Sequence, residues 1–113
     1  MIKNGNIEKD TLKSFEQALV NKERQGYVLR LFVSGTTPKS MRAVENINWI
    51  CKKYLKGRYD LKVIDAYQEL EQMTMEQVVA LPTLIKKLPP PARRIVGDMS
   101  NYKRVCSALS IDQ

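Results

Sequence analysis

Three consecutive prolines, Pro89 to Pro91, constrain the fold of this chain more than any other feature. Proline fixes its φ angle and has no N–H to donate, so this segment can enter neither a helix nor an inner strand. It therefore acts as a stiff spacer between two short apolar runs, Leu84-Ile85 and Ile95-Val96. Four cations flank the spacer: Lys86, Lys87, Arg93 and Arg94. A rigid basic corner of this kind favours docking to a partner over bond-breaking chemistry.

The charge of the chain is positive and unevenly distributed. Nineteen Lys and Arg residues against twelve Asp and Glu residues give a net charge of +7. Residues 63–85 carry four acids and no base, whereas residues 82–104 carry six bases and one acid. This pattern predicts an acidic partner, either a protein face or nucleic acid, although a solvated basic face that only aids solubility is the simpler alternative. Base readout is less well supported, because the chain has only eight aromatic residues and no known nucleic-acid signature.

Length and cysteine content indicate one domain in a reducing compartment. A chain of 113 residues is large enough to bury a core of its own. No window approaches the roughly 18 apolar residues of a membrane span, and the N-terminus lacks the apolar segment of a secretion signal. Cys51 and Cys106 do not form a C-x-x-C pair, so we expect two buried thiols and a cytoplasmic protein, with a disulfide between them as the alternative.

The apolar pattern predicts the order of helices and strands. Residues 1–26 form a polar N-terminal extension, partly helical or disordered, in which Leu12, Phe15 and Leu19 have helical spacing. The domain proper is expected at residues 27–113. Its predicted elements are a strand at 27–33, a helix after Thr37, a parallel strand at 59–64, a weaker helix at 68–79, strands at 83–87 and 93–96, and a last helix at about 100–109.

The first helix of this domain has the clearest signals. Thr37 can cap its N-terminus, Pro38 suits its first position and Gly57 suits its end. Its predicted apolar stripe consists of Met41, Val44, Ile47, Cys51 and Tyr54.

This order, βαβαββα, is that of the thioredoxin and glutaredoxin fold, and the fold class is therefore α/β. Pro82, in Leu81-Pro82-Thr83, resembles the cis-proline that precedes the third strand of that fold. Thioredoxins place a C-x-x-C at the first strand-to-helix turn, where the helix N-terminus lowers a thiol pKa. Residues 35–40 hold no cysteine at that turn, which excludes a dithiol oxidoreductase.

Other catalytic constellations are missing from the sequence as well. The chain has no histidine, which excludes imidazole metal sites and Ser–His or Cys–His nucleophile pairs. Gly35 and Gly97 are isolated and form no phosphate-binding loop. Asp65 has no evident carboxylate partner, so we expect it to anchor a loop or face solvent. We therefore predict a protein that is not an enzyme and that needs no metal or cofactor.

Three segments of the sequence resemble the KaiB family of circadian clock proteins: residues 27–38, 57–65 and 82–101. The run L-P-P-P-x-R-R-I-x-G-D is highly specific, and the similarity extends over roughly residues 27–111, as in a non-cyanobacterial or divergent homologue. The resemblance implies a non-catalytic regulator that binds the hexameric ATPase and autokinase KaiC, in circadian timing or in stress adaptation. It also implies KaiA or a histidine kinase as further partners, and a dimer or tetramer in equilibrium with the monomer.

The resemblance further implies that the C-terminal half can adopt an alternative ground-state packing, so that the chain is metamorphic. Cyanobacterial proteins carry glycine and aspartate where this chain has Ala108 and Ser110. Alanine favours a helix over glycine by about 1 kcal/mol, and serine is slightly better than aspartate. We therefore expect both residues to stabilise the last helix and the thioredoxin-like form.

Contact residues follow from the matching segments: Arg42, Tyr59, Lys62, Lys86, Arg93 and Arg94. Core packing is the alternative role for Tyr59. The alternative for Arg93 and Arg94 is that they lie on opposite faces of an edge strand, one of them structural. Two other functions stay open. One is a thioredoxin-like interaction module of a signalling system, and the other is a nucleic-acid-binding module.

Overall fold

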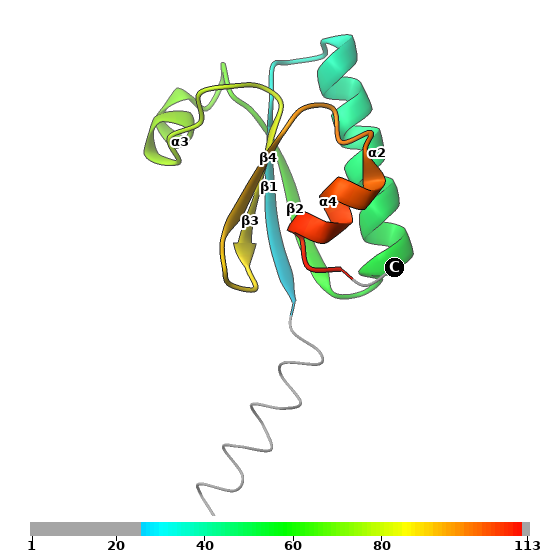
Figure 1. The fold of residues 1–113 in the computed structure, drawn as a ribbon. Helices are drawn as coiled ribbons and strands as arrows, with labels where there is room; N and C mark the ends of the chain where they lie inside the picture. Colours follow the sequence, from blue (N-terminus) through cyan, green and yellow to red (C-terminus); the bar gives the residue numbers. More distant parts are fainter. Residues whose placement is uncertain (1–25, 112–113) are drawn as a thin grey trace, which may run out of the picture.

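The computed structural model describes residues 26–111, which fold around a four-stranded sheet (Figure 1). The strands are β1 (Tyr27–Val33), β2 (Tyr59–Asp65), β3 (Thr83–Leu88) and β4 (Arg93–Val96), and their order in the sheet is β2-β1-β3-β4. β1 and β2 are parallel, whereas β3 is antiparallel to both β1 and β4. The predicted thioredoxin-like order is confirmed. The N-terminal extension, with Leu12, Phe15 and Leu19, falls on residues outside the described part of the chain.

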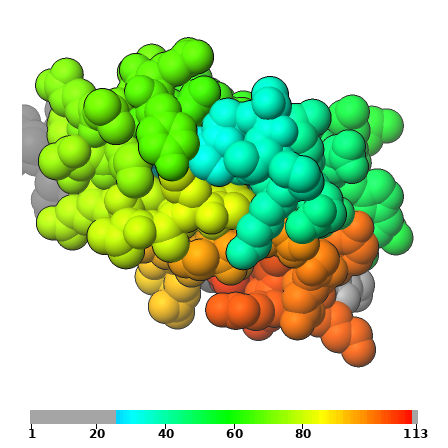
Figure 2. All heavy atoms as spheres, turned by 90° about the horizontal axis from the view of Figure 1, so that it is seen from above, coloured from blue at the N-terminus to red at the C-terminus, as the bar shows by residue number. Residues whose placement is uncertain are grey.

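Three helices cover the two faces of the sheet unequally. Figure 1 shows α2 (Pro38–Tyr54) and α4 (Tyr102–Ala108) on one face and the short α3 (Leu70–Met75) on the other. The view from above in Figure 2 shows the green-to-yellow segment that carries α3 on one side of the molecule and the orange α4 on the other. We call the two faces the helix-packed face and the α3 face.

The main core fills the helix-packed face. Side chains alternate along a strand, so Leu29, Leu31 and Val33 of β1 point toward α2 and α4. The predicted stripe of α2 is partly wrong, since Met41 is exposed and Ala43 is fully buried. The buried stripe lies about one position earlier than predicted, and small side chains face the sheet in the first turns of the helix.

Both ends of α2 follow the predicted signals. The Ser40 amide donates to Thr37 Oγ1 across 3.4 Å, and Pro38 occupies the first helical position. The helix ends at Tyr54, just before Gly57 at a φ of 74°. Gly57 accommodates the left-handed backbone that turns the chain toward β2.

The connections before and after β3 contain cis proline peptide bonds. The Leu81–Pro82 peptide bond is cis, as predicted, and Leu88–Pro89 and Pro90–Pro91 are cis as well. The proline spacer links β3 to β4 as an antiparallel hairpin, with Lys86 opposite Arg93.

The last helix is shorter than predicted and ends in a Schellman motif. The Ser110 amide donates to the Ser107 carbonyl over 3.1 Å, and the Ile111 amide donates to the Cys106 carbonyl over 2.8 Å. Ala108 is the last helical residue, as expected, but the prediction for Ser110 is wrong. Ser110 lies beyond the helix at a φ of 60°, where helix propensity does not apply.

Candidate functional site

One row of side chains crosses the α3 face of the sheet at a single register level. Lys62 of β2 lies opposite Arg30 of β1, Arg30 lies opposite Ile85 of β3, and Ile85 lies opposite Arg94 of β4. Directly opposed residues point to the same face of a sheet, so Arg30 and Arg94 flank the apolar Ile85, and Lys62 lies beyond Arg30. Lys87, two residues after Ile85, extends the group. We call Arg30, Lys62, Lys87 and Arg94 the cationic face.

Acidic residues balance this charge only in part. Arg30 Nη2 lies 3.6 Å from the Asp60 carboxylate, and Lys87 pairs with the carboxylate of Glu76. Lys62 is exposed and forms no ion pair within residues 26–111. Like charges placed opposite one another across a sheet repel, and Asp60 offsets only one of the two charges on Arg30 and Lys62. The cationic face is therefore suited to an acidic partner.

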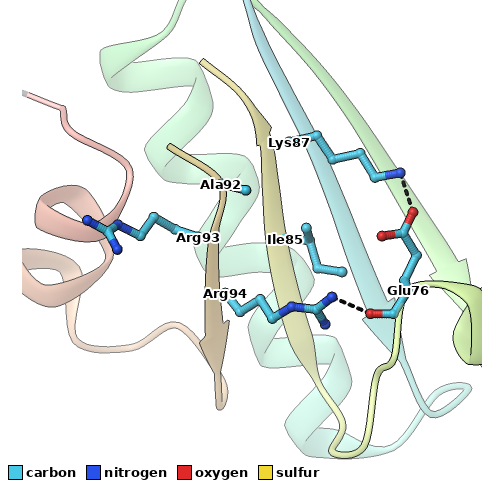
Figure 3. A pocket seen from close by; sticks show the side chains of 6 residues that line it. All are labelled: Glu76, Ile85, Lys87, Ala92, Arg93 and Arg94. Atoms are coloured by element: carbon cyan, nitrogen blue, oxygen red, sulfur yellow. Dashed lines mark hydrogen bonds and ion pairs between the residues drawn. The ribbon is translucent and has the colours of Figure 1, made fainter. Parts of the chain in front are cut away.

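A groove lies at the β3–β4 end of the cationic face (Figure 3). Its volume is about 490 Å³, and its lining residues are Glu76, Ile85, Lys87, Ala92, Arg93 and Arg94. Ile85 is 4% exposed and forms an apolar floor between the two cationic side chains, Lys87 and Arg94. Figure 3 shows these two side chains extending from neighbouring strands toward Glu76.

Arg94 also secures the end of α3. Its guanidinium donates to the main-chain carbonyls of Glu76 and Gln77, which follow the last residue of the helix. The last carbonyls of a helix lack intrahelical partners, and a cation there also interacts favourably with the helix dipole. Arg93 points to the opposite side of β4 (Figure 3). This arrangement matches the alternative role considered for the two arginines, opposite faces with one of them structural, and their contact roles stay predictions.

Lys86 is not a contact residue, and this part of the prediction is wrong. It is only 1% exposed, because the alternation of β3 turns it toward the helix-packed face, opposite Leu29. Its Nζ has no hydrogen-bond partner among the described residues. Burial lowers the pKa of the Lys86 amine from its ordinary value of 10.5, and the nearby Arg93 guanidinium lowers it further.

Arg42 and Tyr59 also lie away from the cationic face. Arg42 of α2 donates to Asp98 Oδ2 over 3.2 Å, and Tyr59 packs half-buried against the main core. The structure thus brings together only Lys62 and Arg94 of the six predicted contact residues. Arg30 and Lys87 were missed, although their even spacing from Phe32 and Ile85 was a usable signal.

A second exposed cluster lies where α2 meets α4, and we call it the helix seam. The rings of Trp49 and Tyr102 stack with their centroids 4.9 Å apart, and Lys53 Nζ lies 4.7 Å from the Trp49 centroid. The Tyr102 hydroxyl donates to Asn46 Oδ1, and Asn46 Nδ2 donates to the Asp98 carbonyl. These groups satisfy one another, so the helix seam serves to hold α4 on α2.

The sequence comparisons bear directly on the family. The family model "KaiB domain" matches residues 30–111. The chain belongs to the KaiB family. It is 47% identical over 88 residues to the circadian clock oscillator protein KaiB of Thermosynechococcus vestitus, covering 78% of this chain and 82% of that protein. It is 42% identical over 92 residues to the same-named protein of a Nostoc species, covering 81% and 85%.

Solved structures share the thioredoxin-like fold of this KaiB-family protein. The N-terminal domain of Synechococcus elongatus SasA aligns with a TM-score of 0.62 at 22% identity, covering 76% of this chain and 85% of that domain. Chloroplastic thioredoxin z aligns with a TM-score of 0.60 at 17% identity, covering 84% and 88%. At these identities the likeness shows the fold alone.

Groups that could support catalysis have structural roles in this KaiB-family protein. Asp65 Oδ1 accepts from the Tyr67 amide over 3.0 Å and anchors the loop after β2, as predicted. Cys51 and Cys106 are buried, and burial raises the pKa of the Cys51 thiol to about 12. Between residues 26 and 111 there is no cluster of three or more side chains suited to a metal, and no helix there could cross a membrane.

Proposed function

We propose that this KaiB-family protein is a non-catalytic regulator that docks through its cationic face onto a KaiC-type hexameric ATPase and autokinase. Docking would modulate the phosphorylation cycle of the ATPase, in circadian timing or stress adaptation. The observation that carries the proposal is the row of Lys62, Arg30, Ile85 and Arg94, on a sheet face that α3 covers only in part. The composition of this row and the family of the chain both support it.

The first feature is the composition of the row. Arginine is enriched among the residues that contribute most to binding at protein interfaces, and surrounding charges raise the rate of association with an oppositely charged partner. The second feature is family membership, since the relatives are named circadian clock oscillator proteins. The lack of histidine and the high pKa of Cys51 support a role without catalysis.

Charge reversal on the cationic face tests the proposal. The purified chain is mixed with the host's KaiC-like ATPase in the presence of ATP, and binding is measured by pull-down and by titration. We expect Lys62→Glu and Arg94→Glu each to weaken binding roughly three- to tenfold, and wild-type binding to weaken as salt rises. Lys103→Glu is the matched control, because Lys103 is exposed on α4 of the other face.

Undiminished binding in both variants, or an equal loss in the control, would reject the cationic face as the docking surface. Absence of any binding by the wild type would reject the function itself. KaiA or a histidine kinase as a second partner, a dimer or tetramer, a cytoplasmic location and the alternative packing of the C-terminal half stay predictions.

A further inference from the structure

Glu76 contacts two of the cationic residues that line the groove, Lys87 and Arg94. Its carboxylate pairs with Lys87, and its main-chain carbonyl accepts from Arg94. The two contacts differ in kind. The carbonyl contact closes the end of α3, whereas the carboxylate contact is an ion pair across the groove (Figure 3). The side chain of Glu76 is therefore free to leave without loss of the cap on α3.

The ion pair of Glu76 with Lys87 is exchangeable. The side chain of Lys87 is 42% exposed and that of Glu76 is 27% exposed. Exposed ion pairs stabilise a protein by only about 0.2–1 kcal/mol, since water screens the charges. An ammonium offers three donors and a guanidinium five, so Lys87 and Arg94 keep capacity for another anion beside their present partners.

The rest of the groove indicates which anion fits. Ile85 and Ala92 give it an apolar floor, and none of its lining residues is aromatic. Binding of single-stranded nucleic acid relies on aromatic side chains on which bases stack. A carboxylate with an apolar side chain beside it, as in an acidic polypeptide, matches both the cations and the floor.

We propose that the groove binds a carboxylate of an acidic polypeptide segment, and that Glu76 holds this position in the free protein as an internal competitor. An apolar side chain of the same segment packs on Ile85. The proposal deepens the docking function above and rests on it only for the identity of the protein that supplies the segment. Glu76 thereby lowers the affinity of the groove for acidic segments, because a segment pairs fully with Lys87 only after it has displaced the Glu76 carboxylate.

Glu76→Gln tests this inference, with Glu71→Gln as the matched control. Both variants remove one negative charge from the α3 region, but Glu71 lies exposed in the first turn of α3 and forms no ion pair within the described residues. The probe is a capped peptide of alternating glutamate and leucine, titrated into the full-length ¹⁵N-labelled chain at about 0.15 M salt, where charges beyond roughly 8 Å are screened.

We expect the peptide to shift the amide signals of Lys87, Ala92 and Arg94. We expect Glu76→Gln to bind it roughly two- to fivefold more tightly than the wild type, and Glu71→Gln to stay near the wild-type affinity. Equal affinities of the two variants, weaker binding by Glu76→Gln, or shifts confined to the helix seam would overturn the inference. Tighter binding of a thymidine oligonucleotide at the same amides would overturn it too.

A parallel titration of both variants with the ATPase separates this inference from the proposed function. If the peptide results hold and the ATPase does not bind, the groove inference stands and the proposed function fails. If the ATPase binds and the peptide leaves the groove amides unchanged, the groove inference fails alone.

Discussion

The two faces of the sheet differ in how many apolar side chains they bury and in how much charge they carry. Among residues 26–111, fifteen buried residues form the core on the helix-packed face, whereas four buried residues, Phe32, Ile64, Val78 and Ile85, form the cluster on the α3 face. Alternate side chains of a strand point to opposite faces, so each face receives about the same number of them. The unequal size of the two apolar clusters therefore comes from which residue types stand at these positions. The helix-packed face carries mostly apolar side chains. On the α3 face, all four strands carry cationic side chains or the acidic residues next to them. Apolar packing and exposed charge are thereby separated between the two faces of one sheet.

The helices on the two faces are held by correspondingly different contacts. α4 buries Val105 and Cys106 in the main core and joins α2 through the helix seam. α3 buries none of its own residues. It is anchored at its end, by the Arg94 contacts to Glu76 and Gln77 and by Val78, whose amide donates to the Met73 carbonyl. The α3 face is therefore the easier one for a partner to alter.

Truncation of core side chains gives the largest expected contrast between the faces. Leu29→Ala removes a fully buried side chain from the main core and is expected to lower the free energy of unfolding by about 3 kcal/mol. Val28→Ala changes the neighbouring, half-buried position on the α3 face and should cost about 1 kcal/mol or less. Urea unfolding followed by the fluorescence of Trp49, the single tryptophan, measures both. Equal losses would contradict the unequal division of the core.

Lys86→Met removes the buried positive charge of β3. An unpartnered buried polar group costs about 1–3 kcal/mol, so the variant should be more stable than the wild type at neutral and lower pH. Because the pKa of Lys86 is lowered in the folded state, the wild type loses stability as pH falls through that lowered pKa. It regains stability as pH rises toward 10.5, the ordinary value of the lysine pKa.

The advantage of Lys86→Met should therefore shrink as pH increases toward 10.5. Unfolding free energies of both proteins at several pH values check this. An advantage that grows with pH, or a variant less stable than the wild type throughout, would show that Lys86 has a favourable partner in the folded protein.

Tyr102→Ala tests the helix seam. The substitution removes the stack on Trp49 and the hydrogen bond to Asn46, and should destabilise the chain by about 1–2 kcal/mol. The emission of Trp49 should shift as its ring becomes more exposed. Lys103→Ala, one residue further on the exposed side of α4, should change stability by at most about 0.5 kcal/mol. If Tyr102→Ala leaves the free energy of unfolding unchanged, the helix seam does not hold α4 on α2.

Ser110→Gly gives the smallest expected effect. A left-handed backbone is unfavourable for residues with a Cβ, and glycine is the common residue at this position of a Schellman motif. We expect a gain of about 0.5 kcal/mol in unfolding free energy, with Ser107→Gly, inside the helix, losing about as much. A loss in Ser110→Gly would mean that the entropy of the unfolded glycine outweighs the relief of backbone strain.

Sequence patterns predicted the fold well because its strands and its longest helix carry strong signals. The apolar run of β1, the cap at Thr37 and Pro38, and the proline spacer placed the elements within a few residues. The pattern failed where a signal was weak. α3 is half as long as predicted. Of its own residues only Met73 packs against the apolar cluster of the sheet, and the helix ends just before Gln77, which adopts a left-handed backbone.

The candidate site was predicted less well, because charge alone does not say which face a strand residue occupies. Lys86 and Lys87 are adjacent and chemically identical, yet one is buried and the other exposed. Lys86 lies two residues after Leu84 and shares its face, whereas Lys87 lies two residues after Ile85 and shares the other face. The register of the four strands then determines which cations lie side by side. The ion pair of Glu76 with Lys87 joins the end of α3 to β3, and no pattern in the sequence predicts this contact.

Lysine footprinting of the complex with the ATPase tests the central claim most directly. An acylating reagent modifies exposed lysines, and mass spectrometry compares the free and the bound protein at Lys62 and Lys87 on the cationic face and at Lys52 and Lys103 on the helix-packed side. We predict that binding protects Lys62 and Lys87 and leaves Lys52 and Lys103 as reactive as before. Protection of Lys52 and Lys103 with unchanged reactivity at Lys62 and Lys87 would contradict the account.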